Sequence, residues 1–217
     1  DEVLRRGPCH AEPERAADLA TLTWSPAEAR ALAQLWSRQG NLAGARKVLT
    51  PHLAAKAAQP QTLLAHDEID RLGSDATTRL KNLTKAATAN PKSLPLRVAL
   101  GEALYETGKA VEARKHLDPL ADLYQDGAVT ETEDLVAVAR SLALNGYFKD
   151  ALGVLDKAED GASEPAEVLA VQLELGELYL QKYNYRDADV ALRKVVAIQP
   201  DHPQAQAGLA RIDLASD

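Results

Sequence analysis

The chain has 217 residues, of which 46% are hydrophobic and only 4% aromatic. Ala, Leu, Glu, Lys, Gln and Arg, which all favour helices, together make up more than half of the chain, so the composition favours helices packed closely through small side chains. The formal charge is −7, from 25 basic and 32 acidic residues, which excludes a general attraction for phosphate backbones and hence nucleic acid as an expected partner.

The cysteine content and the lack of a long apolar run limit the kinds of protein to which the chain can belong. Cys9 is the only cysteine, which excludes an intramolecular disulfide and a multi-cysteine zinc site. No apolar run reaches the roughly 20 residues that a membrane span needs, so we expect no direct membrane insertion. The chain begins at Asp1 and has no methionine, so we expect that an initiator, a leader or a larger N-terminal region has been removed. The N-terminus does not specify the compartment: we expect a soluble protein of the cytoplasm, or a periplasmic or exported one if a leader has been removed.

Residues 1–24 predict an N-terminal extension that is partly helical. Pro8 and Pro13 and the lack of periodicity are typical of a loop over residues 5–13, and residues 11–22 predict a helix. Cys9 and His10 could form half of a metal site or a nucleophile and base pair. A terminal segment between prolines is hard to preorganise, so we interpret them as part of a tail.

One pattern then occurs twice. In the middle of the chain it consists of Leu100, Gly101, Leu104, Gly108, Ala113, Arg114, Lys115, Leu117 and Pro119. The earlier copy consists of Leu32, Ala33, Trp36, Gly40, Ala45, Arg46, Lys47, Leu49 and Pro51. The offset between the copies is the same at every position and equals two periods of a repeat of about 34 residues, which indicates duplicated structural units.

The pattern predicts that each unit consists of a helix, a tight turn and a second helix. Leu96, Leu100 and Leu104 recur every fourth residue, and Gly108 follows where a helix would end. Ala113 in the second helix is small where the two helices must approach closely. The unit is therefore predicted to be a helical hairpin.

These residues resemble the tetratricopeptide repeat, a hairpin of roughly 34 residues with a Leu-Gly pair, a Tyr, a central Gly, a small Ala and a closing Pro. The last copy matches best, with Leu175, Gly176, Tyr179, Tyr185, Ala188, Leu192 and Pro200. The resemblance implies an all-α fold, a right-handed α-solenoid of about five hairpins in a repeat domain over residues 25–217. The hairpins are expected at about residues 25–59, 61–91, 94–127, 132–164 and 169–201, with a capping helix at 203–215 that carries Ala205, Leu209 and Ile212 on one face.

The array is expected to be irregular. The unit at 61–91 is weak, and we take Ala76 as its small residue. The small alanines at 45, 76, 113, 151 and 188 are then spaced unevenly. Pro51 and Pro119 fall inside second helices, and because proline fits best in the first turn of a helix, we expect a break or kink at each, followed by a short extra helical segment.

The sequence contains no catalytic constellation, and we predict that the chain is not an enzyme and needs no cofactor. The cluster from His66 to Asp70 lacks the spacing of a metal site, and we interpret it as a solvated surface with a His66 and Asp70 pair. Tyr179, Tyr183 and Tyr185 could form a stacking platform, but the signature positions of Tyr179 and Tyr185 favour core packing.

The resemblance implies a protein or peptide partner, held on the concave side by residues of the first helices. The expected groove residues are Arg30, Gln34, Ser37, Glu102, Tyr105, Arg140, Glu177 and Gln181. The Lys, Arg and Asn set with which some members grip a C-terminal carboxylate is missing from these positions, so an extended segment or a folded partner is preferred. We hypothesise a scaffold or adaptor, for example in a larger bacterial assembly. The alternatives are an accessory region of a larger enzyme and a self-assembling homo-oligomeric array.

Overall fold

The computed structural model describes residues 24–53 and 58–216, so the predicted extension before Trp24, with Cys9 and His10, lies outside the described residues. The described residues are all-helical and form no strand, which confirms the predicted class. The helices are α2 (Pro26–Arg38), α3 (Leu42–Leu53), α4 (Pro60–Gly73), α5 (Ala76–Ala89), α6 (Leu94–Glu106), α7 (Ala110–Gln125), α8 (Thr132–Leu144), α9 (Phe148–Gly161), α10 (Pro165–Gln181), α11 (Tyr185–Ile198) and α12 (Pro203–Ser216).

The chain divides into two compact units, and the division falls inside α5, between Arg79 and Leu80. In unit 1, α2 contacts both α3 and α4, and Trp36, Leu49 and Ile69 lie in one buried cluster. The weakest of the predicted repeats is therefore the one in which the chain divides.

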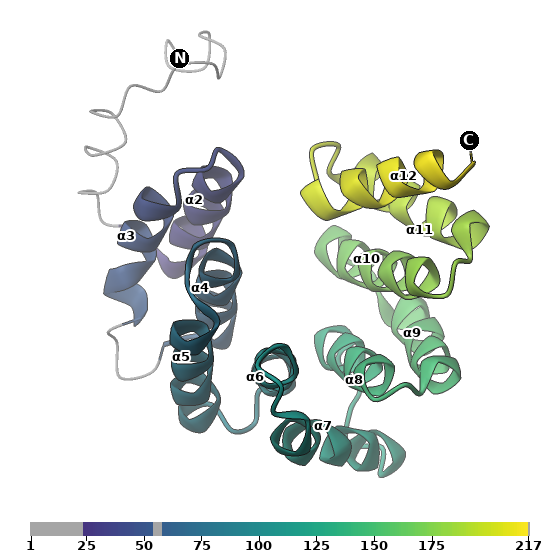
Figure 1. The fold of residues 1–217 in the computed structure, drawn as a ribbon, viewed down its shortest axis with the longest axis horizontal. Coiled ribbons are helices and arrows are strands. Elements are labelled where there is room, and N and C mark those ends of the chain that lie inside the picture. Colours follow the sequence, from purple (N-terminus) through teal and green to yellow (C-terminus); the bar gives the residue numbers. More distant parts are fainter. Residues whose placement is uncertain (1–23, 54–57, 217) are drawn as a thin grey trace, which may run out of the picture. The chain divides into compact units, whose positions relative to one another are not determined.

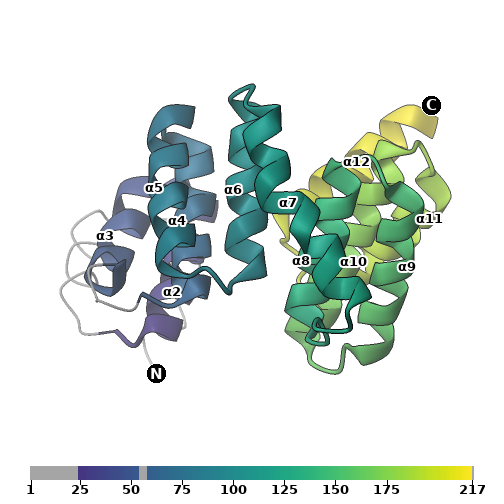
Figure 2. The same cartoon turned by 90° about the horizontal axis from the view of Figure 1, so that it is seen from below.

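Unit 2 consists of two layers of helices (Figures 1 and 2). The first layer holds α6, α8, α10 and α12, in which each helix contacts the next, and the second holds α7, α9 and α11. Each second-layer helix packs against the first-layer helices before and after it in the chain. The largest buried cluster, which includes Leu117, Val138, Leu155 and Val171, fills the space between the layers.

Small residues let the two helices of a hairpin approach. A Cβ on Gly101 would come within 2.6 Å of the Leu117 side chain, and one on Gly176 within 2.5 Å of Leu192, so any larger residue would force the helices apart. Ala113 and Ala188, which follow these two glycines at one and the same spacing, have no exposed surface. Ala33 with Ala45, and Ala139 with Ala151, repeat this spacing and are 0% or 1% exposed.

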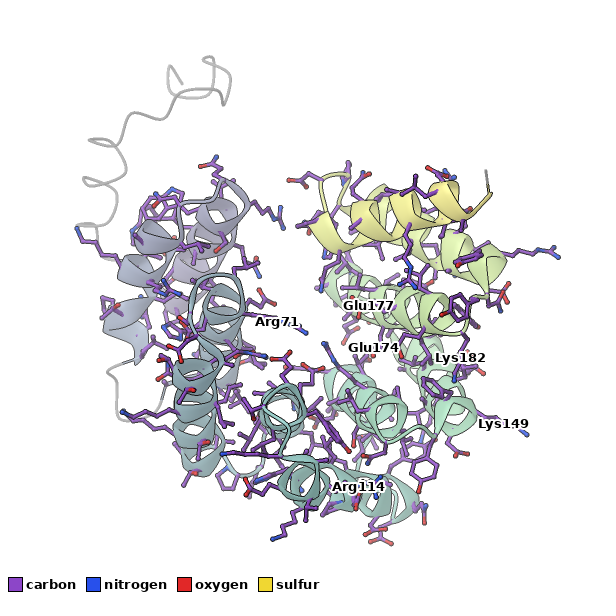
Figure 3. The ribbon with its side chains drawn as sticks, viewed as in Figure 1. Arg71, Arg114, Lys149, Glu174, Glu177 and Lys182 are labelled. Atoms are coloured by element: carbon purple, nitrogen blue, oxygen red, sulfur yellow. The ribbon has the colours of Figure 1, made fainter. Side chains whose placement is uncertain are left out.

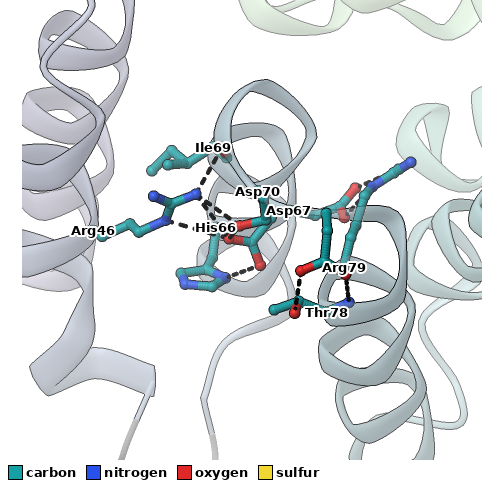
Figure 4. Close-up of polar contacts among 9 residues, drawn as sticks. Arg46, His66, Asp67, Ile69, Asp70, Thr78 and Arg79 are labelled. Atoms are coloured by element: carbon teal, nitrogen blue, oxygen red, sulfur yellow. Dashed lines mark hydrogen bonds and ion pairs between the residues drawn. The ribbon is translucent and has the colours of Figure 1, made fainter.

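The second hairpin replaces this pair of small residues by a buried ion pair. Its two equivalent positions hold Asp67 and Arg79, which are 8% and 3% exposed, and Arg79 donates to the Asp67 carboxylate from Nε at 2.8 Å and Nη2 at 3.0 Å (Figure 4). The prediction that Ala76 is the small residue of this unit was wrong, because Ala76 is exposed at the start of α5. Position 79 is thus the equivalent of the small alanine in the second helix of the other hairpins. The first three of these positions, 45, 79 and 113, are evenly spaced.

In four of the five hairpins the turn between the two helices follows one pattern of hydrogen bonds. Gly108 has φ +76°, its N–H donates to Tyr105, and the N–H of the next residue donates to Leu104. This Schellman arrangement requires a left-handed residue, for which glycine has no steric penalty. Gly40 and Gly146 repeat the arrangement, and in the last hairpin the same position is held by Tyr183 with φ 57°.

The breaks predicted at the two internal prolines are wrong. Helix α3 continues through Pro51, and α7 continues from Ala110 to Gln125 through Pro119. A proline inside a helix leaves carbonyls of the preceding turn short of donors. In α7 the carbonyl that loses its donor to Pro119 is that of Lys115. The next two carbonyls of this turn accept hydrogen bonds from side chains of neighbouring helices, because Arg97 donates to the His116 carbonyl at 3.1 Å and Ser141 to the Leu117 carbonyl at 3.0 Å.

Helix α12 covers the end of the array, as predicted for a capping helix. Ala205 and Ile212 are buried against α11 and α10, and a Cβ on Gly208 would lie 2.6 Å from Leu192. Gln204, Gln206 and Arg211 are exposed. Within residues 24–53 and 58–216, no helix is both long and apolar enough to cross a membrane.

Candidate partner-binding face

The first layer of unit 2 brings four charged side chains together, and we name Glu102, Arg140, Glu174 and Glu177 the acidic cluster. They come from three successive first-layer helices, α6, α8 and α10. Arg140 donates from Nε to Glu102, and its Nη1 lies 3.8 Å from Oε2 of Glu174. Glu177 lies one turn beyond Glu174 on α10 (Figure 3).

Burial controls the charge of this cluster. The side chains of Glu102 and Glu174 are only 10% and 11% exposed, whereas Arg140 is 33% exposed. Burial raises the pKa of Glu174 to about 7, and this outweighs the attraction of Arg140, while Glu177 and Glu102 raise the pKa further. Burial alone would lower the pKa of Arg140, but Glu102, Glu174 and Glu177 together raise it, so this guanidinium stays charged.

The cluster therefore carries three carboxyl groups against one cation. With all four groups ionised its net charge is two negative, and below about pH 7 it becomes one negative because Glu174 takes up a proton. Such a surface attracts an ammonium or guanidinium group. Among the described residues, no group of three His, Cys, Asp or Glu side chains has the geometry to hold a metal ion.

The structure places the other expected groove residues differently. The Tyr105 hydroxyl donates to Oδ1 of Asn145 at 2.8 Å, at the end of α8, so it connects two helices of the layer. Gln181 is exposed at the end of α10.

The three expected residues of unit 1 all lie on α2. Arg30 donates to Gln59 and to the buried Thr62, at 3.1 and 3.2 Å, and thus holds α2 to the start of α4. Ser37 donates to the carbonyl of Ala33 in its own helix, and Gln34 is exposed. Of these three, Gln34 projects furthest into solvent.

Glu174 is the one member of the acidic cluster that the sequence analysis missed. The repeat register that selects Arg140 on α8 selects Glu177 on α10, and Glu174 lies one turn before it. The available signal was a charged residue between Leu173 and Leu175.

The interpretation of residues 66–70 as a solvated surface was wrong, although the expected pair of His66 and Asp70 is present at 3.3 Å. Asp70 is 2% exposed and also accepts from Arg46 of α3, whose guanidinium reaches the Ile69 carbonyl and Ser74 at the end of α4 (Figure 4). These contacts hold α3 to α4 and give this cluster a structural role within unit 1.

The tyrosines near the end of the chain divide as predicted. Tyr179 and Tyr185 pack against buried clusters of unit 2, whereas Tyr183 is 71% exposed. The Tyr183 and Tyr185 rings meet edge to face with centroids 6.3 Å apart.

Comparisons with known proteins agree with this architecture. Residues 75–131 match the family model described as tetratricopeptide repeat. No curated protein matches the chain. Among solved structures, a thermophilic tetratricopeptide-repeat protein of Thermus thermophilus, TTC0263, aligns with a TM-score of 0.59 and 18% identity over 88% of this chain and 100% of that one.

A second solved structure, the human IFIT1 dimer with m7Gppp-AAAA, aligns with a TM-score of 0.58 and 18% identity over 94% of this chain and 50% of that chain. Likeness at this identity shows the fold alone. The resemblance inferred from the repeated residues is thus confirmed: the chain has the helical-hairpin fold of the tetratricopeptide-repeat proteins, and residues 75–131 carry the sequence pattern of that family.

Proposed function

We propose that the chain is a non-catalytic protein-interaction module, and that the first-layer face of unit 2 binds a basic segment of a protein partner. The fold is one that generally serves as a scaffold for protein partners. The observation that carries the choice of a basic segment is the acidic cluster, which presents more carboxylates than cations on that face.

The contacts within the cluster assign different roles to its members. Arg140 is held by Glu102 and Glu174, so it neutralises buried carboxylates and is poorly available to a ligand. Glu177 is partly exposed and is the member best placed to pair with a lysine or arginine of the partner. Gln181, one turn further on and exposed, offers hydrogen bonds to the backbone of the same segment.

The test is fluorescence anisotropy with three labelled ten-residue peptides that differ only in charge: lysine- and arginine-rich, glutamate-rich, and neutral. We expect the basic peptide to bind tightest and to lose affinity as salt is raised. Glu177→Lys should weaken it by about tenfold, which corresponds to one lost charge pair in a partly buried setting. Asp160→Lys, with the same charge change on exposed α9, is the matched control and should bind normally.

Equal binding of the three peptides, or equal loss in the two variants, would contradict a charge-selective site on this face. Reversal of Arg140 is unsuited to this test. It would leave Glu102 and Glu174 buried without their cation, and the loss of folding would hide any loss of binding.

A further inference from the structure

A pocket of about 680 Å³ lies on the other side of unit 2, in the second layer. It runs between α7 and α9, and the end of α8 forms its floor. Its apolar lining consists mainly of Leu117, Ala121, Leu142 and Val154. The volume is within the range of sites that hold small organic ligands, about 300 to 1,000 Å³.

Gly153 gives this pocket its depth. It lies in the middle of α9, where glycine is the least favourable residue after proline, and it is exposed. A Cβ at this position would meet no atom within 4 Å, so close packing does not require glycine here, in contrast to Gly101 and Gly176. Any side chain at position 153 would project into the pocket.

A cation–π contact spans one end of the pocket. Lys157 reaches from α9 over the ring of Tyr124 on α7, with its Nζ 5.1 Å from the ring centroid. A long segment that continues past this contact is therefore disfavoured, and a ligand that ends inside the pocket is favoured.

The opposite end is polar and held in place by hydrogen bonds. Asn145 accepts from the Tyr105 hydroxyl and donates to Oδ1 of Asp118 at 2.9 Å. Arg114 lies beside the Tyr105 hydroxyl, which is the main cause of the raised pKa of this guanidinium. A polar end that is already organised loses little entropy when a ligand binds.

Two cations and two carboxylates line this end of the pocket, and the cations are the groups that remain available to a ligand. Asp118 already accepts from Asn145 and lies near Arg114, and Asp150 lies in the first turn of α9, where the helix dipole stabilises a negative charge. Lys149 has no hydrogen-bond or ion-pair partner among the described residues, and its ammonium extends into solvent (Figure 3). Its flexible stem lines the pocket, so it is available to an anion at the mouth.

We propose that this pocket binds a small organic carboxylate, with the carboxylate at the Arg114 end and an apolar chain or ring over Gly153. The site is separate from the first-layer face, so a test of ligand binding here is independent of the test of partner binding there.

Decanoate below its micelle concentration is the probe, and 1-decanol is its uncharged counterpart. Calorimetry or ligand-induced shifts in amide NMR spectra would measure both. We expect one decanoate to bind per chain, with shifts centred on α7 and α9, and decanol to bind at least about tenfold more weakly. Arg114→Gln should weaken decanoate by a similar factor and leave decanol unchanged.

Gly153→Leu fills the pocket and should abolish decanoate binding. Since leucine favours a helix, this variant should also melt at a higher temperature, so that lost binding cannot be ascribed to unfolding. Gly161→Leu, at the end of the same helix and outside the pocket, is the matched control and should bind normally, as should Glu177→Lys. Unchanged binding by Gly153→Leu, or equal affinity for decanoate and decanol, would overturn the proposal.

Discussion

Tyr183 occupies a backbone conformation that three other hairpins reserve for glycine. Its φ of 57° and the hydrogen bonds around it match those at Gly40, Gly108 and Gly146. A left-handed conformation costs a residue with a side chain about 1–2 kcal/mol. The contact with the Tyr185 ring offsets part of this cost. Aromatic pairs stabilise by roughly 0.5–1.5 kcal/mol, and this pair belongs at the low end of the range because the Tyr183 ring is exposed.

Replacing Tyr183 by glycine is therefore expected to raise the free energy of unfolding, by up to about 1 kcal/mol. Urea denaturation of wild type and Tyr183→Gly measures the difference. In a Tyr185→Ala background, where the ring contact is already lost, the gain should be larger. The reciprocal change Gly146→Ala should cost about 1 kcal/mol, and a neutral result there would show that this conformation carries no penalty in these turns.

Glu174 makes stability depend on pH. The folded chain holds its proton up to about pH 7, whereas the ordinary value for a glutamate is 4.5. Between these values the folded state binds the extra proton, so the free energy of unfolding falls as pH rises, by up to about 3 kcal/mol in all. In Glu174→Gln the stability should no longer fall over this pH range, and the variant should be more stable than the wild type at pH 8. Thermal melts at a series of pH values measure both. Asp160→Asn, on an exposed position of α9, should keep the wild-type pH profile.

Protonation of Glu174 also affects the proposed partner site. As pH falls from 8 to 6 the acidic cluster loses one negative charge, so binding of the basic peptide should weaken in the wild type. In Glu174→Gln the affinity should be weaker at pH 8 and nearly constant over the same range. Peptide anisotropy at fixed ionic strength measures both.

At the scale of helices, the hairpin of α4 and α5 differs from its neighbours in how its helices meet. Four hairpins use two small residues 12 positions apart, and this one uses Asp67 and Arg79. A buried ion pair is often no more stabilising than apolar residues of suitable size, but removal of one partner is costly.

A double-mutant cycle tests this account. Asp67→Ala leaves the Arg79 guanidinium buried without its carboxylate and should destabilise by about 3–5 kcal/mol. The double variant Asp67→Ala with Arg79→Ala recreates the pair found at Ala33 and Ala45, and it should recover most of that loss. Chemical denaturation of the four proteins gives the coupling energy. Additive effects of the two single changes would contradict a direct pairing.

Helix α7 accepts hydrogen bonds from residues distant in sequence in the turn before its internal proline. Ser141 donates to the Leu117 carbonyl in a buried position, so Ser141→Ala leaves that carbonyl without the donor. We expect a loss of about 1–3 kcal/mol in the free energy of unfolding. Chemical denaturation of the wild type and the variant measures the difference. Thr107→Ala, which removes a partly buried hydroxyl bonded within its own helix, should cost less.

For the whole molecule, α12 is needed to cover the last hairpin. Leu180, Leu192 and Val195 lie in one buried cluster with Ala205 and Ile212 of α12. Truncation after Asp201 would expose this cluster, so we expect a lower melting temperature and aggregation on heating. Ala205→Asp should have the same effect with the helix in place. Exposed Leu214 provides the control, since Leu214→Asp should melt like the wild type.

The repeat pattern predicted the positions of the hairpins because helical period and turn glycines are local signals. The same signals failed in the second hairpin. Arg79 occupies a position that holds a small residue in the other hairpins. Its burial could not be predicted without knowing that Asp67, on the preceding helix, is its partner. The helix-breaking effect of Pro119 was inferred from its own helix alone, whereas the turn before it also accepts hydrogen bonds from Arg97 and Ser141 of two other helices.

The binding face was predicted in part for the same reason. The repeat register predicted the positions of Glu102, Arg140 and Glu177. Whether these side chains contact one another depends on tertiary packing across three helices. Glu174 was missed because its neighbours in the sequence are apolar and burial of a carboxyl group is rare. Which of these groups is available to a ligand is a property of the packed structure.

The ion pair between Asp67 and Arg79 also determines which parts of this chain can be exchanged. Helix α3, α7, α9 or α11 grafted in place of α5 would bring an alanine to position 79 and leave Asp67 buried without a cation. Helix α5 grafted after α2, α6, α8 or α10 would bury Arg79 against a small apolar residue. A complete hairpin carries both charges with it. For recombination or consensus design on this chain, the smallest interchangeable module is therefore the hairpin and not the helix.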